Sequence, residues 1–133
     1  MSKIDWKALP PADLADEAAA FRHDNDDGSA YFFDPEDADW RFEMTDPALL
    51  AAFSGPDEAR TWIDTEIATF EADGMTGRAH AYRSMLTDGF TDPVIIGQIG
   101  SQGRLWDGWH RTAIAMVRGE GLPAIVGTPR NPA

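Results

Sequence analysis

The chain turns from a strand into a helix within one stretch, Leu105-Trp106-Asp107-Gly108-Trp109-His110-Arg111-Thr112-Ala113. A short apolar strand breaks at Asp107-Gly108, and His110, Arg111 and Thr112 fall in the first turn of the helix that follows. A helix N-terminus presents unpaired backbone N–H groups and a partial positive charge, which favour an anion, most often a phosphate. Gly108 lets the backbone come close to such a ligand, and Arg111 can add a two-pronged contact to phosphate oxygens. The alternative is a buried strand–turn–helix corner that His110 and Arg111 only cap and solvate.

Hydrophobic periodicity predicts the elements on either side of this turn. Apolar residues recur at helical spacing over 57–72, whereas 94–99 is a continuous β-branched run of the kind found in buried strands. Helices are predicted over about residues 12–22, 57–72, 78–87 and 109–118, and strands near 31–33, 40–44, 94–99, 104–106 and 123–127. We therefore expect an α/β (α+β) fold, with a small mixed sheet and surrounding helices.

Length and composition predict one globular domain over residues 1–133, with a hydrophobic content of 43%. The sequence has no run of about 18 apolar residues and no signal-peptide pattern, so we expect no membrane association and a cytoplasmic location. Cysteine is absent, which excludes thiol catalysis, disulfides and cysteine-ligated metals. The three histidines, His23, His80 and His110, are far apart, so we expect no protein metal site.

The chain is acidic, and its charge is unevenly distributed. The formal net charge is −12, and residues 1–58 hold 15 acidic and 4 basic residues, against 8 and 7 in 59–133. We therefore distinguish an acidic N-terminal extension, 1–58, from a core, 59–127. Phosphate neutralisation dominates nucleic-acid affinity, so we expect no direct DNA binding, and we expect an anionic ligand on the core. The acidic residues serve solubility, face a basic protein partner, or rest against core arginines; the sequence leaves these three roles open.

The second half of the chain carries three linked motifs in a fixed order. They are a Gly-x-x-x-Pro entry into a strand (Gly89, Pro93), the Asp-Gly-x-His-Arg-x-x-x-Ala helix start (107–115), and a closing Pro-Ala-Ile-Val strand (123–126). This pattern, over about residues 78–127, resembles the ParB/sulfiredoxin-like superfamily. The resemblance implies that nucleotide phosphates bind at the helix start.

The residues that the resemblance assigns to this phosphate pocket are Gly108, Trp109, His110, Arg111 and Thr112, with Gly89 and Phe90 beside them. Arg83, on the helix over 78–87, is the candidate for a second phosphate contact and is preferred to His80. Asp107 would orient Arg111 or a Mg²⁺ ion that accompanies the nucleotide. Trp106 and Trp109 flank the turn; one of them stacks on a base, or both pack beneath the turn, and packing is preferred.

The sequence also departs from the superfamily. Sulfiredoxin chemistry needs a cysteine in this turn, so sulfinic-acid reduction is excluded. Chromosome-partitioning members continue into a DNA-binding region, whereas about six residues follow the last predicted strand here, so we do not expect a CTP-switched DNA clamp. Free-serine kinases of this fold use an acidic base, for which Glu66, Glu71 and Asp107 are unranked candidates.

The sequence therefore predicts a protein that binds a nucleotide or a phosphorylated small molecule, either without catalysis or as a small phosphotransferase or nucleotide hydrolase. The alternative is an acidic protein-binding module, an inhibitor or nucleic-acid mimic that has lost the nucleotide. An acidic segment over 23–34 resembles a calcium loop in outline. His23 stands where an Asp is required and Asp34 replaces the bidentate Glu, so a solvated turn is favoured.

Overall fold

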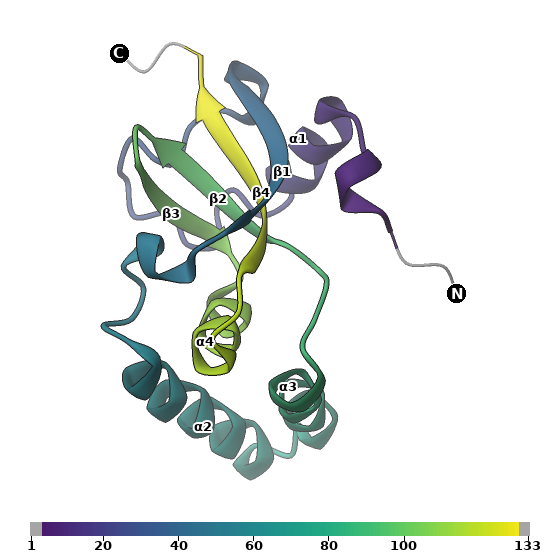
Figure 1. The fold of residues 1–133 in the computed structure, drawn as a ribbon, viewed down its shortest axis with the longest axis vertical. Coiled ribbons are helices and arrows are strands. Elements are labelled where there is room, and N and C mark those ends of the chain that lie inside the picture. Colours follow the sequence, from purple (N-terminus) through teal and green to yellow (C-terminus); the bar gives the residue numbers. More distant parts are fainter. Residues whose placement is uncertain (1–3, 131–133) are drawn as a thin grey trace.

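The computed structural model describes residues 4–130, which form an α+β fold (Figure 1). A four-stranded mixed sheet is surrounded by helices, as the sequence predicts. The strands are β1 (Ala38–Thr45), β2 (Val94–Ile99), β3 (Gln102–Asp107) and β4 (Leu122–Pro129). The helices are α1 (Pro11–Ala19), α2 (Pro56–Ala72), α3 (Thr76–Asp88) and α4 (Trp109–Arg118), with short 3₁₀ turns at Trp6–Ala8, Pro35–Asp37 and Pro47–Leu50. No helix within the described residues is long and apolar enough to cross a membrane.

The strands lie in the order β1-β4-β2-β3. β2 and β3 form an antiparallel hairpin, and α4 then returns the chain so that β4 runs parallel to β2, with Ile95 opposite Ile125. β1 pairs antiparallel with the other side of β4. The turn from β3 into α4 therefore lies at the end of the hairpin, beside the start of β2.

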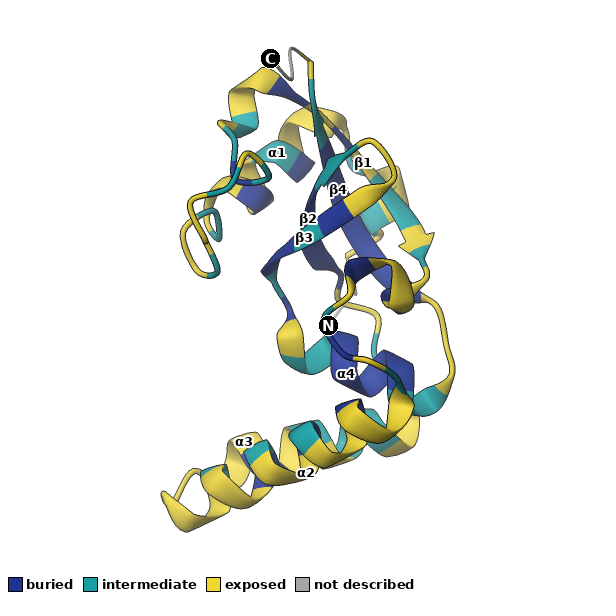
Figure 2. Ribbon diagram, turned by 90° about the vertical axis from the view of Figure 1, so that its left-hand side faces the viewer, coloured by how far each residue is buried: buried dark blue, intermediate teal, exposed yellow. Residues whose placement is uncertain are grey.

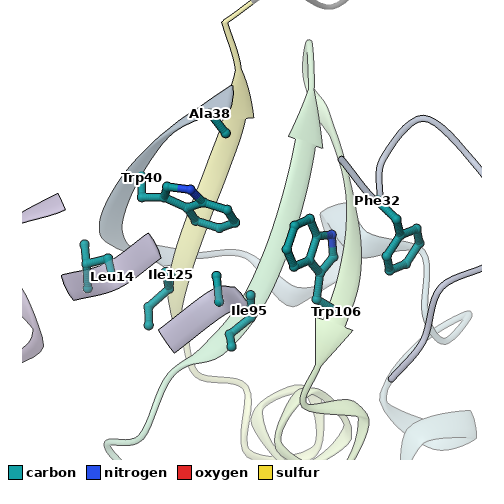
Figure 3. Packing of buried hydrophobic residues seen from close by; sticks show 8 residues of the cluster. Leu14, Phe32, Ala38, Trp40, Ile95, Trp106 and Ile125 are labelled. Carbon is teal, nitrogen blue, oxygen red and sulfur yellow. The ribbon is translucent and has the colours of Figure 1, made fainter. Parts of the chain in front are cut away.

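The β2 strand is buried on both faces, because successive side chains of a strand point to opposite sides of the sheet. Ile95 packs with Trp40, Trp106 and Ile125 on the face that α1 covers, as Figure 3 shows. The opposite face, with Val94 and Ile96, packs against α4 and the Pro47–Leu50 turn. Two buried faces explain why residues 94–99 carry a continuous apolar run.

Two glycines in the sheet make room for tryptophan rings. A Cβ on Gly127 would lie 2.5 Å from the ring of Trp40. A Cβ on Gly97 would lie 2.2 Å from the Tyr31 carbonyl oxygen and 2.5 Å from Trp106 Nε1. The sheet thus accepts both large rings because these two positions carry no side chain.

The predicted strand over 31–33 is wrong. Tyr31 and Phe32 lie in a turn, and the backbone of this aromatic segment bonds to side chains instead of to a neighbouring strand. Trp106 Nε1 donates to the Tyr31 carbonyl at 2.9 Å, and Arg22 Nε donates to the Phe33 carbonyl at 3.0 Å. The ring of Phe32 stacks on Trp106 with centroids 5.9 Å apart. The segment therefore covers the sheet as an aromatic loop.

The remaining elements confirm the predicted strands near 40–44, 94–99, 104–106 and 123–127 and the helices over 57–72, 78–87 and 109–118. The first helix ends at Ala19, earlier than predicted. α2 packs on α4 through Ile63, Ile67 and Ile114, and Figure 2 shows the outer sides of α2 and α3 exposed.

The acidic first 58 residues are not a separate extension of the fold. They supply β1, which pairs along β4, and α1, which covers one face of the sheet. Within residues 4–130, two ion pairs join this segment to arginines of the second half, Asp27 to Arg104 at 4.0 Å and Asp39 to Arg130 at 2.9 Å. The apolar residues of this segment therefore join it to the core, and most of its carboxylates face solvent.

Candidate functional site

The turn between β3 and α4 is built around Gly108. Its φ of +112° lies in the left-handed region that favours glycine. A Cβ there would lie 2.3 Å from Cγ1 of Val94, the first residue of β2. No side chain among residues 4–130 caps the first turn of α4. Packing against Val94 thus requires a glycine whether or not a ligand binds, and the same glycine leaves the helix start uncapped.

Arg111 is the cationic side chain at this helix start. Its Nη1 donates to the Pro93 carbonyl at 2.5 Å, and its Nη2 donates to Asp107 Oδ2 at 3.3 Å. These two bonds hold a side chain that is 26% exposed, and within residues 4–130 they leave three of its five guanidinium N–H donors for a ligand.

Two clefts meet at Arg111. The larger, of about 610 Å³, is also lined by Gly89, Phe90 and Arg118. The smaller, of about 270 Å³, is lined by Asp107 together with the aromatic rings of Trp6 and Phe21. The structure therefore brings Gly89, Phe90 and Asp107 to Arg111, as the sequence predicts.

Arg118 was not predicted as a site residue, although it stands in the last turn of the predicted helix over 109–118. Its Nε and Nη2 donate to the Glu120 carboxylate, at 3.1 and 2.8 Å. Its Nη1 donates to the carbonyls of Leu86 and Thr87 at the end of α3. Arg118 thus fastens the end of α3 to α4. Its four bonds leave one of its five N–H donors, so among the described residues Arg111 retains more free donors in the cleft.

His110 faces the helices rather than the clefts. Its Nε2 lies 3.1 Å from Glu66 Oε1 on α2, and its ring stacks on Tyr82 of α3 with centroids 4.6 Å apart. Burial lowers the pKa of His110, while the hydrogen bond to Glu66 acts in the opposite direction. The uncharged imidazole therefore dominates at neutral pH and joins α4 to the α2–α3 pair.

The other predicted contacts have different surroundings. Thr112 is fully buried, and its Oγ1 donates to the Gly108 carbonyl at 2.9 Å, so its side chain lies in the interior. Trp109 is 37% exposed, and its ring meets the ring of Phe53 edge-on at 5.8 Å. Trp106 is fully buried in the core, so it packs there and cannot stack on a base, in agreement with the preferred alternative.

Arg83 is not brought to the turn. It pairs with Glu71 on the exposed surface of the α2–α3 hairpin, and this hydrogen bond lowers the pKa of the Glu71 carboxyl. Helix packing therefore separates both residues from the helix start. Of the three candidate acids, Glu66 and Asp107 remain at the turn, bonded to His110 and Arg111 respectively.

Within residues 4–130, no group of three or more His, Asp and Glu side chains is arranged to hold a metal ion. The carboxylates of the calcium-like loop accept backbone N–H bonds: Asp26 from Gly28, and Asp27 from Ser29. Asp34 accepts the N–H of Glu36 at the start of a 3₁₀ turn. At the helix start, Asp92 and Asp107 line the same cleft as Arg111.

No family model, no curated protein and no solved structure matches this chain. The chemistry of the site therefore rests on its own geometry.

Proposed function

We propose that the chain binds a small phosphorylated ligand of the nucleotide class at the start of α4. The observation that carries the proposal is the position of Arg111, a partly exposed guanidinium with free donors, at the junction of two clefts and beside an uncapped helix N-terminus. Helix N–H groups and a guanidinium fork are complementary to phosphate oxygens. Together they supply donors suited to one phosphate group.

The surrounding residues support this role for Arg111. The Pro93 carbonyl and the Asp107 carboxylate fix its direction, so little side-chain entropy is lost when an anion binds. The resemblance of residues 78–127 to the ParB/sulfiredoxin-like superfamily implies a phosphate at the same place.

Magnesium is the ion that would accompany such a ligand. Mg²⁺ on a nucleotide uses one or two protein carboxylates together with phosphate oxygens and water. Asp92 and Asp107, which line the cleft beside Arg111, fit that requirement. The ion would also offset the repulsion between these carboxylates and the phosphate.

A thermal-shift panel tests the proposal. We would measure the unfolding of the wild type and of Arg111→Gln with ATP, ADP, CTP, GTP, inorganic tripolyphosphate and phosphate, each with magnesium. A ligand at about 100 times its Kd stabilises the fold by about 2.7 kcal/mol. We expect a shift in the wild type that is lost in Arg111→Gln and kept in the control Arg60→Gln, which removes an exposed arginine of α2. Failure of every ligand to shift the wild type would overturn the proposal.

The acidic surface supports a second candidate, binding of a basic protein. Among the described residues, few carboxylates of the first 58 residues form ion pairs, and most are exposed. This candidate predicts that no ligand of the panel shifts the unfolding of the wild type. The same panel therefore discriminates between the two functions.

A further inference from the structure

A third cavity adjoins the start of α4 on the side opposite Arg111. Trp109 and Arg111 are two residues apart in a helix, so their side chains point about 200° apart around its axis. The cavity has a volume of about 410 Å³, and its walls include Trp109, Phe32, Leu50, Leu105, Asn25 and Arg104. None of these residues touches the clefts at Arg111.

Trp109 forms a flat, partly exposed wall of this cavity. It is the most exposed of the five tryptophans, at 37%. The edge-on contact with Phe53 at 5.8 Å holds the orientation of its indole. A large aromatic side chain held in place at a cavity wall provides a surface on which a planar ring can stack.

The polar groups of the cavity lie among apolar walls and carry no net charge. Asn25 Nδ2 donates to the Trp106 carbonyl at 3.2 Å, which fixes its amide group at the wall. The Arg104 guanidinium lies 4.7 Å from the centre of the Tyr31 ring and 4.0 Å from the Asp27 carboxylate. Apolar walls with a few fixed polar groups are typical of sites that bind a neutral ring with hydrogen-bonding edges.

The end of the Pro47–Leu50 turn forms part of the cavity wall. Ala51, which also lines the cavity, has a φ of +52° and is the non-glycine residue with a left-handed conformation among residues 4–130. Ala51 is the C-cap of the Pro47–Leu50 turn, and its backbone N–H donates to the Ala48 carbonyl, so the end of that turn forms this part of the wall.

We propose that this cavity, the Trp109 cavity, binds the heteroaromatic ring of the ligand whose phosphate contacts Arg111. The ring stacks on Trp109, and the phosphate lies at the N–H groups of the α4 start between the ring and Arg111. This inference rests on the proposed function and assigns the ligand to the nucleoside phosphates. The smaller cleft at Arg111 is also lined by aromatic rings, but its walls carry three carboxylates, from Glu17, Asp92 and Asp107, against a single guanidinium. That cleft suits a magnesium ion, which would offset the repulsion between the carboxylates and the phosphate, better than the ring.

The test compares nucleoside triphosphates with inorganic tripolyphosphate, which has the phosphates but no ring. We would titrate the ¹⁵N-labelled protein with ATP, GTP, CTP, UTP and tripolyphosphate in magnesium, and follow the indole N–H signals, with that of Trp109 assigned from Trp109→Phe. Stacking of one base predicts that the best nucleotide binds roughly 5- to 150-fold more tightly than tripolyphosphate. We also expect the Trp109 signal to shift with nucleotides and not with tripolyphosphate.

Two variants locate the ring. Trp109→Ala should weaken the nucleotide to the affinity of tripolyphosphate and leave the Kd of tripolyphosphate unchanged, whereas Trp109→Phe should retain most of the difference. Trp6→Ala, which removes the competing aromatic wall beside Arg111, should leave the ratio of the two Kd values unchanged, because any effect on the phosphate contacts is shared by the nucleotide and tripolyphosphate. A nucleotide advantage that depends on Trp6 and not on Trp109 overturns the inference.

The two proposals fail in different ways. If tripolyphosphate binds and no nucleotide binds more tightly, the phosphate site stands and the ring site is overturned. If neither tripolyphosphate nor any nucleotide binds, the proposed function fails and the ring site fails with it. The indole signals of the wild type distinguish these outcomes even if Trp109→Ala does not fold.

Discussion

Replacing Gly97 by alanine should strongly destabilise the fold, because this glycine makes room for the aromatic loop that covers β2. The added Cβ would lie 2.2 Å from the Tyr31 carbonyl oxygen and 2.5 Å from Trp106 Nε1. Both distances are far below van der Waals contact, so Tyr31 has to move away. The indole N–H of Trp106 then loses the acceptor that it now reaches at 2.9 Å.

The size of the effect follows from two costs. Overpacking a core by one methyl group costs about 1–3 kcal/mol. Trp106 is fully buried, so an indole N–H left without an acceptor costs about another 1–3 kcal/mol. We therefore expect a loss of about 2–6 kcal/mol, against a total stability of about 5–15 kcal/mol for a domain of this kind.

Urea unfolding, followed by circular dichroism, measures this loss. The matched control is Gly77→Ala in α3, where a Cβ would meet no atom within 4 Å. That change should stabilise the helix by up to about 1 kcal/mol, because alanine is a better helix former than glycine. If Gly97→Ala unfolds within about 0.5 kcal/mol of the wild type, the aromatic loop does not pack as described.

Two further changes test the turn and its histidine. Gly108→Ala should cost about 2–6 kcal/mol in urea unfolding, because a left-handed φ and a Cβ 2.3 Å from Val94 Cγ1 both oppose the added methyl group. Gly119→Ala, with a φ of +67° and no atom near its Cβ, should cost less. Burial holds the folded-state pKa of His110 below its unfolded value of 6.5, so the unfolded chain binds the proton more readily and stability should fall as the pH drops through 6.5 towards the folded pKa. The free energy of unfolding should change with pH by at most about 1.4 kcal/mol per pH unit through this group. Between about pH 7.5 and 5.5, His110→Gln should flatten this dependence, whereas the control His80→Gln, at an exposed position, should follow the wild type. An unchanged slope in His110→Gln would show that burial does not control this group.

The regular elements could be predicted because their signal is local. Residues 57–72 repeat their apolar side chains at helical spacing, and 94–99 are apolar throughout because both faces of β2 are buried. The aromatic run 31–33 has the composition of a strand, yet its carbonyls accept bonds from Trp106 and Arg22, which are distant in sequence. Local composition carries no information about such partners, so this prediction failed.

In the candidate site, too, some contacts could be predicted from the sequence and others could not. The spacing of four between Asp107 and Arg111 is the spacing of helical neighbours, so their pairing can be read from the sequence. The hydrogen bond from Arg111 to the Pro93 carbonyl cannot be read from the sequence, because it depends on where β2 begins beside α4. Arg83 was assigned to the site by its position along a helix, but the packing of α3 on α2 turns it towards Glu71.

The acidic first 58 residues gain a role from the two proposals taken together. The phosphate contacts would come from the β3–α4 turn and the residues before β2. The Trp109 cavity takes Asn25, Phe32 and Leu50 from the acidic segment. The acidic segment would therefore supply walls to the ring site and to the smaller cleft, whereas the phosphate donors belong to the second half of the chain. A second protein with the same turn but another N-terminal segment would hold the same phosphate and select a different ring, because the walls that face the ring, and not the helix start, would have changed.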